Sequence, residues 1–162
     1  MKNIELNYKI QLSQLEELPE EDQRLVKKAI EATNNSYAPY SNFHVGACLR
    51  TADGLEMVGA NQENAAFPSG LCAERSAIFA AQSQHPESAI VAIAIAARNE
   101  EGLMAQPVSP CGACRQVILE MEDRYQCDVK ILLYGTKGIY VIPNVKTLLP
   151  LHFVVSCMKY DG

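Results

Sequence analysis

Three cysteines and one glutamate stand at spacings that suit metal chemistry. Cys72 precedes Glu74 by two residues, and Cys111 and Cys114 form a Cys-x-x-Cys pair directly after Pro110. Thiolates are common zinc ligands, and three protein ligands leave the fourth tetrahedral position open for water. A glutamate two residues beyond a ligand can reach that water without binding the metal, as a proton shuttle must. The residues therefore predict a catalytic site with one Zn²⁺ per chain.

The two cysteine units also fall where a loop is predicted to run into a helix. Free backbone N–H groups and the helix dipole stabilise a thiolate at such a helix start. We therefore expect lowered pKa values for all three thiols, Cys72, Cys111 and Cys114.

Further motifs make the sequence resemble the cytidine deaminase family, specifically its three-cysteine zinc, homotetrameric class. The stretch YSNFHVGA at residues 40–47 resembles the family's N-terminal motif, and NQENA at residues 61–65 resembles its Asn-x-Glu-Asn-Ala motif. Leu-Leu-Pro at residues 148–150, followed by Phe153, resembles the C-terminal motif. Ala66 and Phe67 depart from the pattern, because Ser and Tyr are usual there.

The resemblance implies roles for residues around the substrate. Phe43 is expected to pack on the base or sugar, and Asn61 and Glu63 are expected to bind the ribose 3′ hydroxyl. Ala73 is assigned to the substrate pocket, and Phe153 is expected to reach the site of a neighbouring subunit. The implied assembly is a homotetramer with its sites at subunit interfaces.

The implied reaction is hydrolysis of cytidine and deoxycytidine to uridine and deoxyuridine plus ammonia, in pyrimidine salvage. Zinc-bound hydroxide would attack C4 of the ring, with Glu74 delivering a proton to N3 and then to the departing amine. Zn²⁺ with three thiolates carries a net negative charge, which weakens its pull on water. Arg75 is therefore expected to hydrogen-bond the thiolate sulfurs from outside the metal shell.

Other functions remain open from the residues alone. A blasticidin-S-type aminonucleoside deaminase would share the zinc motif and differ in its substrate pocket. A structural-zinc binding module is a different class, in which Cys48, Cys127 or Cys157 would complete a four-cysteine shell. Arg115 is interpreted as a solvated helix charge or a subunit contact. The histidines, His44, His85 and His152, are not expected to bind metal.

The pattern of apolar residues predicts the elements that must hold these groups. Helical spacing begins at Pro19, strand-like alternation brackets an Asp-Gly turn, and two later helices each precede a strand. The order predicts an α/β domain, and the resemblance implies a three-layer α-β-α fold around a mixed sheet of about five strands. The expected helices are 19–35, 72–82 and 111–122, and the expected strands are 43–51, 55–60, 89–97, 129–133 and 139–142.

Composition limits the remaining choices. A chain of 162 residues with 48% apolar content suits one domain, residues 1–162, in which residues 1–18 form an N-terminal extension able to add a strand or an arm. The formal charge of −5 and the pI near 5.2 argue against nucleic acid as a partner. The longest apolar stretch, 89–97, is too short to span a membrane, and no secretory signal opens the chain. We therefore expect a cytoplasmic enzyme with a small-molecule nucleoside substrate.

Overall fold

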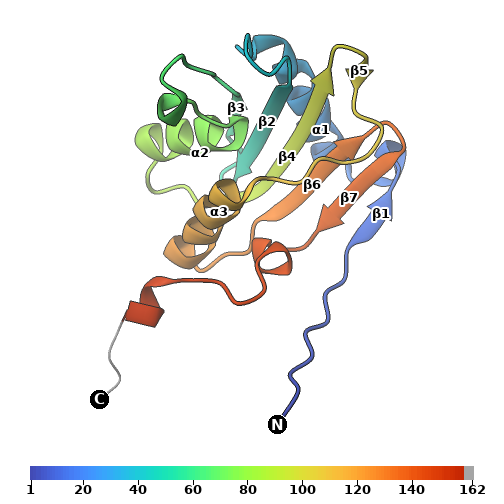
Figure 1. Ribbon diagram of the computed structural model, residues 1–162. Coiled ribbons are helices and arrows are strands. Elements are labelled where there is room, and N and C mark those ends of the chain that lie inside the picture. The colour runs from blue at the N-terminus through green and yellow to red at the C-terminus, as the bar shows by residue number, and fades with distance from the viewer. Residues whose placement is uncertain (159–162) are drawn as a thin grey trace.

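A computed structural model describes residues 1–158 as a mixed sheet with helices on both faces (Figure 1). Within these residues the sheet has seven strands in the order β1-β7-β6-β4-β2-β3, and β5 pairs with β4. The strands are β1 Gln11–Ser13, β2 His44–Thr51, β3 Glu56–Ala60, β4 Ile90–Asn99, β5 Gly102–Leu103, β6 Lys130–Gly135 and β7 Gly138–Ile142.

The helices are of two kinds, and all the predicted α-helices form. They are α1 Glu20–Ala32, α2 Ala73–Gln84 and α3 Gly112–Tyr125. Short 3-10 turns connect or end the elements, at Leu15–Glu17, Thr33–Asn35, Phe67–Ser69, Val145–Leu148 and Val155–Met158. None of the helices in the described chain is long and apolar enough to cross a membrane.

The three layers follow from the alternation of side chains along the central strands. Figure 1 shows α2 and α3 in front of the sheet and α1 behind it. Successive residues of a strand point to opposite faces, so Ala92, Ala94 and Ala96 of β4 pack with α1, while Ile93 and Ile95 pack with α2 and α3. The predicted α/β fold with helices on both sides of a mixed sheet is confirmed.

The strand count exceeds the expected number of about five. Residues 11–13 of the N-terminal extension pair antiparallel with residues 139–141 of β7, and the two residues of β5 pair with the end of β4. β1 is made by backbone pairing at the edge of the sheet and β5 by pairing with the end of the central strand β4, and both carry too few residues to show an alternating pattern. The extension therefore adds a strand, which was one of the two roles expected for it.

Two glycines shape the β2–β3 hairpin, and one of them lets the start of α2 pack against it. Gly54 makes the predicted turn with a φ of +87°, a backbone conformation that glycine adopts without strain. Gly59 of β3 lies so close to α2 that a Cβ atom there would come within 2.4 Å of the Ala73 carbonyl oxygen. The missing side chain lets the first turn of α2 rest directly on β3.

Candidate functional site

The three predicted cysteines come together where α2 and α3 begin. Cys72 is the N-cap of α2, Cys111 is the N-cap of α3, and Cys114 lies in the first turn of α3. Their sulfur atoms all lie within 4.8 Å of one another, and the sulfurs of Cys72 and Cys111 are 3.9 Å apart. Two loops that are distant in the sequence thus bring three possible thiolate ligands close together.

This donor set suits zinc. Three thiols within 4.8 Å of one another match the ligand set of a catalytic zinc site, in which a fourth position stays open for water. Among residues 1–158, the three form the one group of possible metal ligands, and Cys48, Cys127 and Cys157 lie outside it. The structural-site alternative therefore lacks its fourth cysteine in the described chain.

The thiols are not equivalent. A hydrogen bond from Cys114, with further help from Arg75, lowers the pKa of Cys72 to about 5. The pKa of Cys114 is raised, because its thiol is the donor in that hydrogen bond and because it is buried. The expectation of a lowered pKa is confirmed for Cys72 and wrong for Cys114, because adjacent sulfurs share protons rather than ionising independently.

Arg75 lies beside this cluster as expected. Its Nη2 atom donates to the Cys72 sulfur at 3.3 Å, and the thiolate raises the pKa of the guanidinium. Its Nε atom is buried without a hydrogen-bond partner among the described residues. The guanidinium charge therefore lies next to the Cys72 sulfur.

Glu74 is the buried acid of the site. It is only 4% exposed, and it lies in the first turn of α2. Burial raises the pKa of its carboxyl, and the nearby Cys72 thiolate raises it further. A raised pKa makes the carboxyl a better proton acceptor, as general acid–base catalysis requires.

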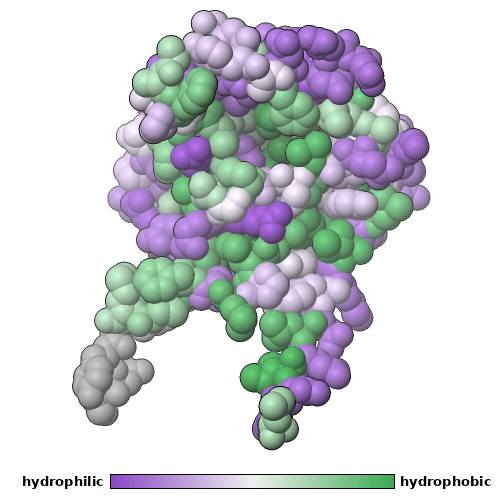
Figure 2. All heavy atoms as spheres, viewed as in Figure 1, coloured by the Kyte–Doolittle hydropathy of each residue, from purple (hydrophilic) through white to green (hydrophobic). Residues whose placement is uncertain are grey.

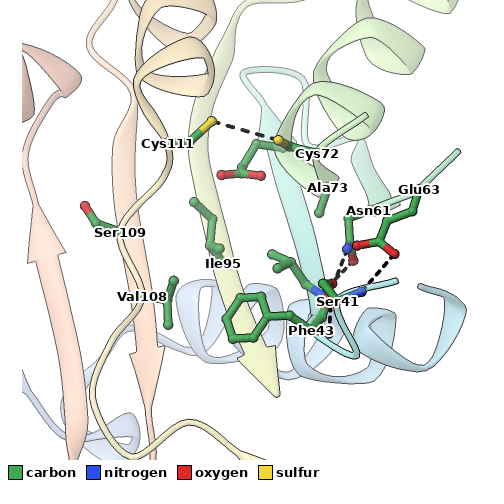
Figure 3. Close-up of a pocket in the computed structure, with 12 residues that line it drawn as sticks. Ser41, Phe43, Asn61, Glu63, Cys72, Ala73, Ile95, Val108, Ser109 and Cys111 are labelled. Carbon is green, nitrogen blue, oxygen red and sulfur yellow. Dashed lines mark hydrogen bonds between the residues drawn. The ribbon is translucent and has the colours of Figure 1, made fainter. Parts of the chain in front are cut away.

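A cavity of about 320 Å³ opens beside the thiols. Figure 3 shows Cys72 and Cys111 at one end and Phe43 at the other, with Asn61 and Glu63 along one side. The lining brings together most of the predicted site residues, namely Phe43, Asn61, Glu63, Cys72, Ala73, Glu74 and Cys111.

Hydrogen bonds to the backbone fix the polar side of the cavity. The Asn61 amide accepts from the Val45 N–H at 2.7 Å and donates to the Phe43 carbonyl at 3.0 Å. One Glu63 carboxylate oxygen accepts from the N–H groups of Tyr40 and Ser41, at 2.8 and 3.3 Å. A hydrogen bond from the Ser41 side chain, together with these backbone bonds, lowers the pKa of Glu63, so it faces the cavity as a carboxylate.

Phe153 stands apart from the other predicted residues. It does not line the cavity of its own chain, and 57% of its surface is exposed. Its carbonyl oxygen accepts a hydrogen bond from Gln116 on α3, at 2.9 Å. The Phe153 side chain is thus exposed on the segment that follows β7, outside the cavity.

The sequence also left some contributors unassigned. Ser41, Ile95, Val108 and Ser109 also line the cavity. Ser41 lies within the quoted motif at 40–47, Val108 and Ser109 directly precede Pro110, and Ile95 was marked only by the predicted buried strand 89–97. Arg115 is half-buried and hydrogen-bonded within its own chain, so its interpretation as a solvated helix charge is wrong, whereas a subunit contact stays a prediction. Its guanidinium donates to the Pro110 and Leu148 carbonyls, both at 2.8 Å, and to Ser109 Oγ at 3.1 Å, and so it fixes the loop before Cys111.

Comparison with known proteins gives one consistent result. The family profile described as "Cytidine and deoxycytidylate deaminase zinc-binding region" matches residues 19–127. A cytidine deaminase of Halalkalibacterium halodurans is 42% identical over 137 residues, which cover 85% of this chain and 97% of that protein. One from Sporosarcina psychrophila is 39% identical over 140 residues, covering 85% and 95%.

A solved structure agrees with these sequence relatives. The crystal structure of cytidine deaminase from Burkholderia pseudomallei superposes with a TM-score of 0.69 at 37% identity, and the match covers 80% of this chain and 97% of that one. The protein is thus a deaminase-class, zinc-dependent hydrolase by fold and by site. More narrowly, the chain belongs to the cytidine and deoxycytidylate deaminase zinc-binding family.

Proposed function

We propose that the chain hydrolyses the exocyclic amine of cytidine and deoxycytidine, forming uridine or deoxyuridine and ammonia in pyrimidine salvage. The observation that carries the proposal is the buried Glu74 carboxyl beside three thiols at the end of a cavity whose side presents Asn61 and Glu63. A proton-transfer group, a metal cluster and polar groups suited to a sugar are thereby arranged around one space.

The thiols of Cys72, Cys111 and Cys114 would hold the metal, because their sulfur atoms lie within 4.8 Å of one another. Zinc bound there supplies a nucleophile at neutral pH by lowering the pKa of a water molecule. The guanidinium of Arg75 offsets part of the thiolate charge through its contact with Cys72. This contact keeps the site from becoming too electron-rich for that role.

Glu74 moves the protons. Because burial raises its pKa, the carboxyl can take up a proton from the attacking water and pass it to ring N3. It can then take the second proton of that water and pass it to the amine, which leaves as ammonia. Its place on the first turn of a helix fixes its position, so little ordering is needed during the reaction.

The cavity orients the nucleoside. Phe43, Ile95 and Val108 give an apolar space for a flat base, and Ala73 lies at the point where the base would approach α2. Asn61 and Glu63 are placed to hydrogen-bond the sugar hydroxyl. The base end of the substrate is thereby directed toward the thiols.

We also propose a homotetramer with sites at subunit interfaces, built from the whole chain 1–162 as one domain. Large apolar side chains that stay exposed support this assembly, including Phe67, Phe79 and Phe153 at 75%, 47% and 57% exposed. Figure 2 shows further apolar residues on both projecting ends of the chain. For location we propose the cytoplasm, where thiols stay reduced and able to bind metal.

An assay of purified, zinc-analysed protein on cytidine, deoxycytidine, cytosine, CMP and blasticidin S tests the proposal. Both nucleosides should lose ammonia, and free cytosine should be a poor substrate because it leaves the polar groups of Asn61 and Glu63 unpaired. Turnover of blasticidin S alone would favour the aminonucleoside alternative. A zinc-loaded protein inert toward all five would contradict the proposal.

A further inference from the structure

We infer that Ser36, which does not line the cavity, is a positioning residue for its sugar side. The Ser36 hydroxyl fixes the Asn61 amide so that Asn61 offers a substrate one hydrogen-bond donor and no acceptor. The inference rests on the proposed function and adds a specificity-determining residue to it.

The hydrogen bonds of Asn61 can be counted completely. An amide has one oxygen with two lone pairs and one nitrogen with two hydrogens. Asn61 Oδ1 accepts from the Val45 N–H at 2.7 Å and from Ser36 Oγ at 2.6 Å, which uses both lone pairs. Asn61 Nδ2 gives one hydrogen to the Phe43 carbonyl at 3.0 Å. One N–H therefore remains for a ligand.

The amide cannot take the opposite orientation. A backbone N–H only donates and a carbonyl oxygen only accepts, so the contacts with Val45 and Phe43 assign the oxygen and nitrogen of Asn61. Since Asn61 Oδ1 can only accept, the Ser36 hydroxyl must be the donor in their contact.

His44 supports this direction of hydrogen bonding. Its Nδ1 atom lies 3.2 Å from Ser36 Oγ. Because the Ser36 proton is already given to Asn61, His44 must carry a hydrogen on Nδ1 and donate it to the Ser36 oxygen. His44 thus donates to Ser36, Ser36 donates to Asn61, and Asn61 lines the cavity.

Glu63 offers the complementary group. Its Oε2 atom accepts from the N–H groups of Tyr40 and Ser41, and the Ser41 side chain adds a further hydrogen bond to the carboxylate. A carboxylate has about four lone-pair sites, so it can still accept one more hydrogen bond. One free N–H on Asn61 and one free lone pair on the Glu63 carboxylate together fit a group that accepts one hydrogen bond and donates one. A hydroxyl does both, whereas a hydrogen, an ether or a phosphate ester at that position cannot donate to Glu63.

Removing the Ser36 hydroxyl would alter this selection without touching the metal or Glu74. Asn61 Oδ1 would regain a free lone pair, and the amide would keep two of its three fixed contacts. Asn61 would then be less firmly held and no longer restricted to donation. The expected loss falls on recognition of the sugar hydroxyl and not on the chemical step.

The test compares wild type, Ser36→Ala, Ser36→Thr and, as a matched control, Ser83→Ala, whose exposed hydroxyl bonds only within α2. For each zinc-analysed protein, kcat and KM are measured with cytidine and with 3′-deoxycytidine, which lacks the hydroxyl. In Ser36→Ala, KM for cytidine should rise roughly five- to tenfold with kcat little changed, the size expected for one hydrogen bond. Its preference for cytidine over 3′-deoxycytidine should fall by a similar factor, and Ser36→Thr should restore both.

Two results would overturn the inference. Wild-type KM and preference in Ser36→Ala, or a fall in kcat and zinc content that Ser36→Thr does not rescue, would leave Ser36 without a positioning role while the proposed function stands. Failure of zinc-loaded wild type to deaminate cytidine would instead remove the proposed function, and this inference with it.

Discussion

Cys48 and Cys72 are thiols on opposite faces of one sheet, and their surroundings shift their pKa values in opposite directions. Cys48 of β2 packs beneath α1 in the apolar core, where burial raises its pKa to about 12. Cys72 at the start of α2 receives hydrogen bonds from Cys114 and Arg75, which lower its pKa to about 5. The side-chain type is the same, so the difference lies in the donors that surround each sulfur.

Charged groups differ between the two faces in the same way. On the α1 side, Asp22 is 1% exposed and is paired with both Arg50 and Lys130, so its charge is neutralised within the chain. On the α2–α3 side, Glu74 is buried without any ion pair in the described chain, and Arg75 keeps an unpartnered Nε. On the α1 face the buried charge is paired within the chain. On the other face, Glu74 and Arg75 keep groups that can interact with a metal site and a substrate.

The largest expected effect is on metal binding. Replacing Cys72, Cys111 or Cys114 by Ala removes one of three protein ligands, so zinc and activity should both be lost. Cys48→Ala changes a thiol on the other face and should retain about one zinc per chain. Metal analysis of the purified variants checks this, and loss of zinc from Cys48→Ala would break the distinction between the two faces.

A large effect of a different kind is expected from Asp22→Asn. The change leaves Arg50 and Lys130 without their buried partner and should lower the free energy of unfolding by about 3 kcal/mol. Zinc content and kcat of the folded protein should stay at wild-type values. Denaturant titration measures the loss, with Glu21→Gln as control, because that exposed partner of Arg50 should cost less than about 1 kcal/mol. Zinc loss from Asp22→Asn would contradict the separation of the faces.

Arg75→Gln should give an intermediate effect on the site side. Without the guanidinium the thiolate charge is not offset, so zinc affinity should fall about 10- to 100-fold and the acid limb of the activity profile should move to higher pH. Arg124→Gln, at the far end of α3, is the control and should change neither. Competition with a chelator and a pH profile of the zinc-saturated enzyme provide the readouts, and an unchanged acid limb would remove the charge-offset role.

The smallest expected effect concerns Glu122, a buried glutamate that accepts from the N–H groups of Val129 and Val145. Burial raises its pKa, so the folded state binds the proton more tightly than the unfolded state. Its stabilising contribution is therefore present below the unfolded pKa of about 4.3 and is lost as the pH rises through the folded pKa.

Wild type should accordingly lose stability relative to Glu122→Gln as the pH rises above about 4.3. Urea unfolding of both proteins between acid and neutral pH measures this difference. Glu120→Gln, an exposed change on the same helix, should show no such trend. A stability difference that is flat with pH would show that Glu122 does not titrate as its burial implies.

The sequence predicted the α2–α3 face better than the edges of the sheet. The spacing of Cys72, Glu74, Cys111 and Cys114 could be interpreted because metal and proton chemistry restrict both residue type and position. The helices and long strands could be predicted because burial imposes a period. By contrast, β1 and β5 depend on backbone pairing of a few residues with β7 and with the end of β4, which leaves almost no pattern in the side chains.

Contacts between distant segments were the other part that the sequence could not supply. Arg115 looked like an ordinary helix charge, yet it holds carbonyls of two separate loops. The unequal pKa shifts of Cys72 and Cys114 arise from the hydrogen bond between their sulfurs, from the burial of Cys114 and from the contact of Arg75 with Cys72, none of which the spacing along the chain specifies. The bond from Ser36 to Asn61 likewise joins residues that are close only after folding.

The most direct test of the account compares two buried glutamates, both with raised pKa values. Glu74→Gln should keep about one zinc per chain and lose about 10²- to 10⁴-fold in cytidine turnover, because it removes the group that carries the protons. Glu122→Gln should keep both zinc and turnover. Near-normal turnover in Glu74→Gln, or loss of zinc from it, would contradict the assignment of Glu74 as the proton-transfer residue at a metal held by the three cysteines.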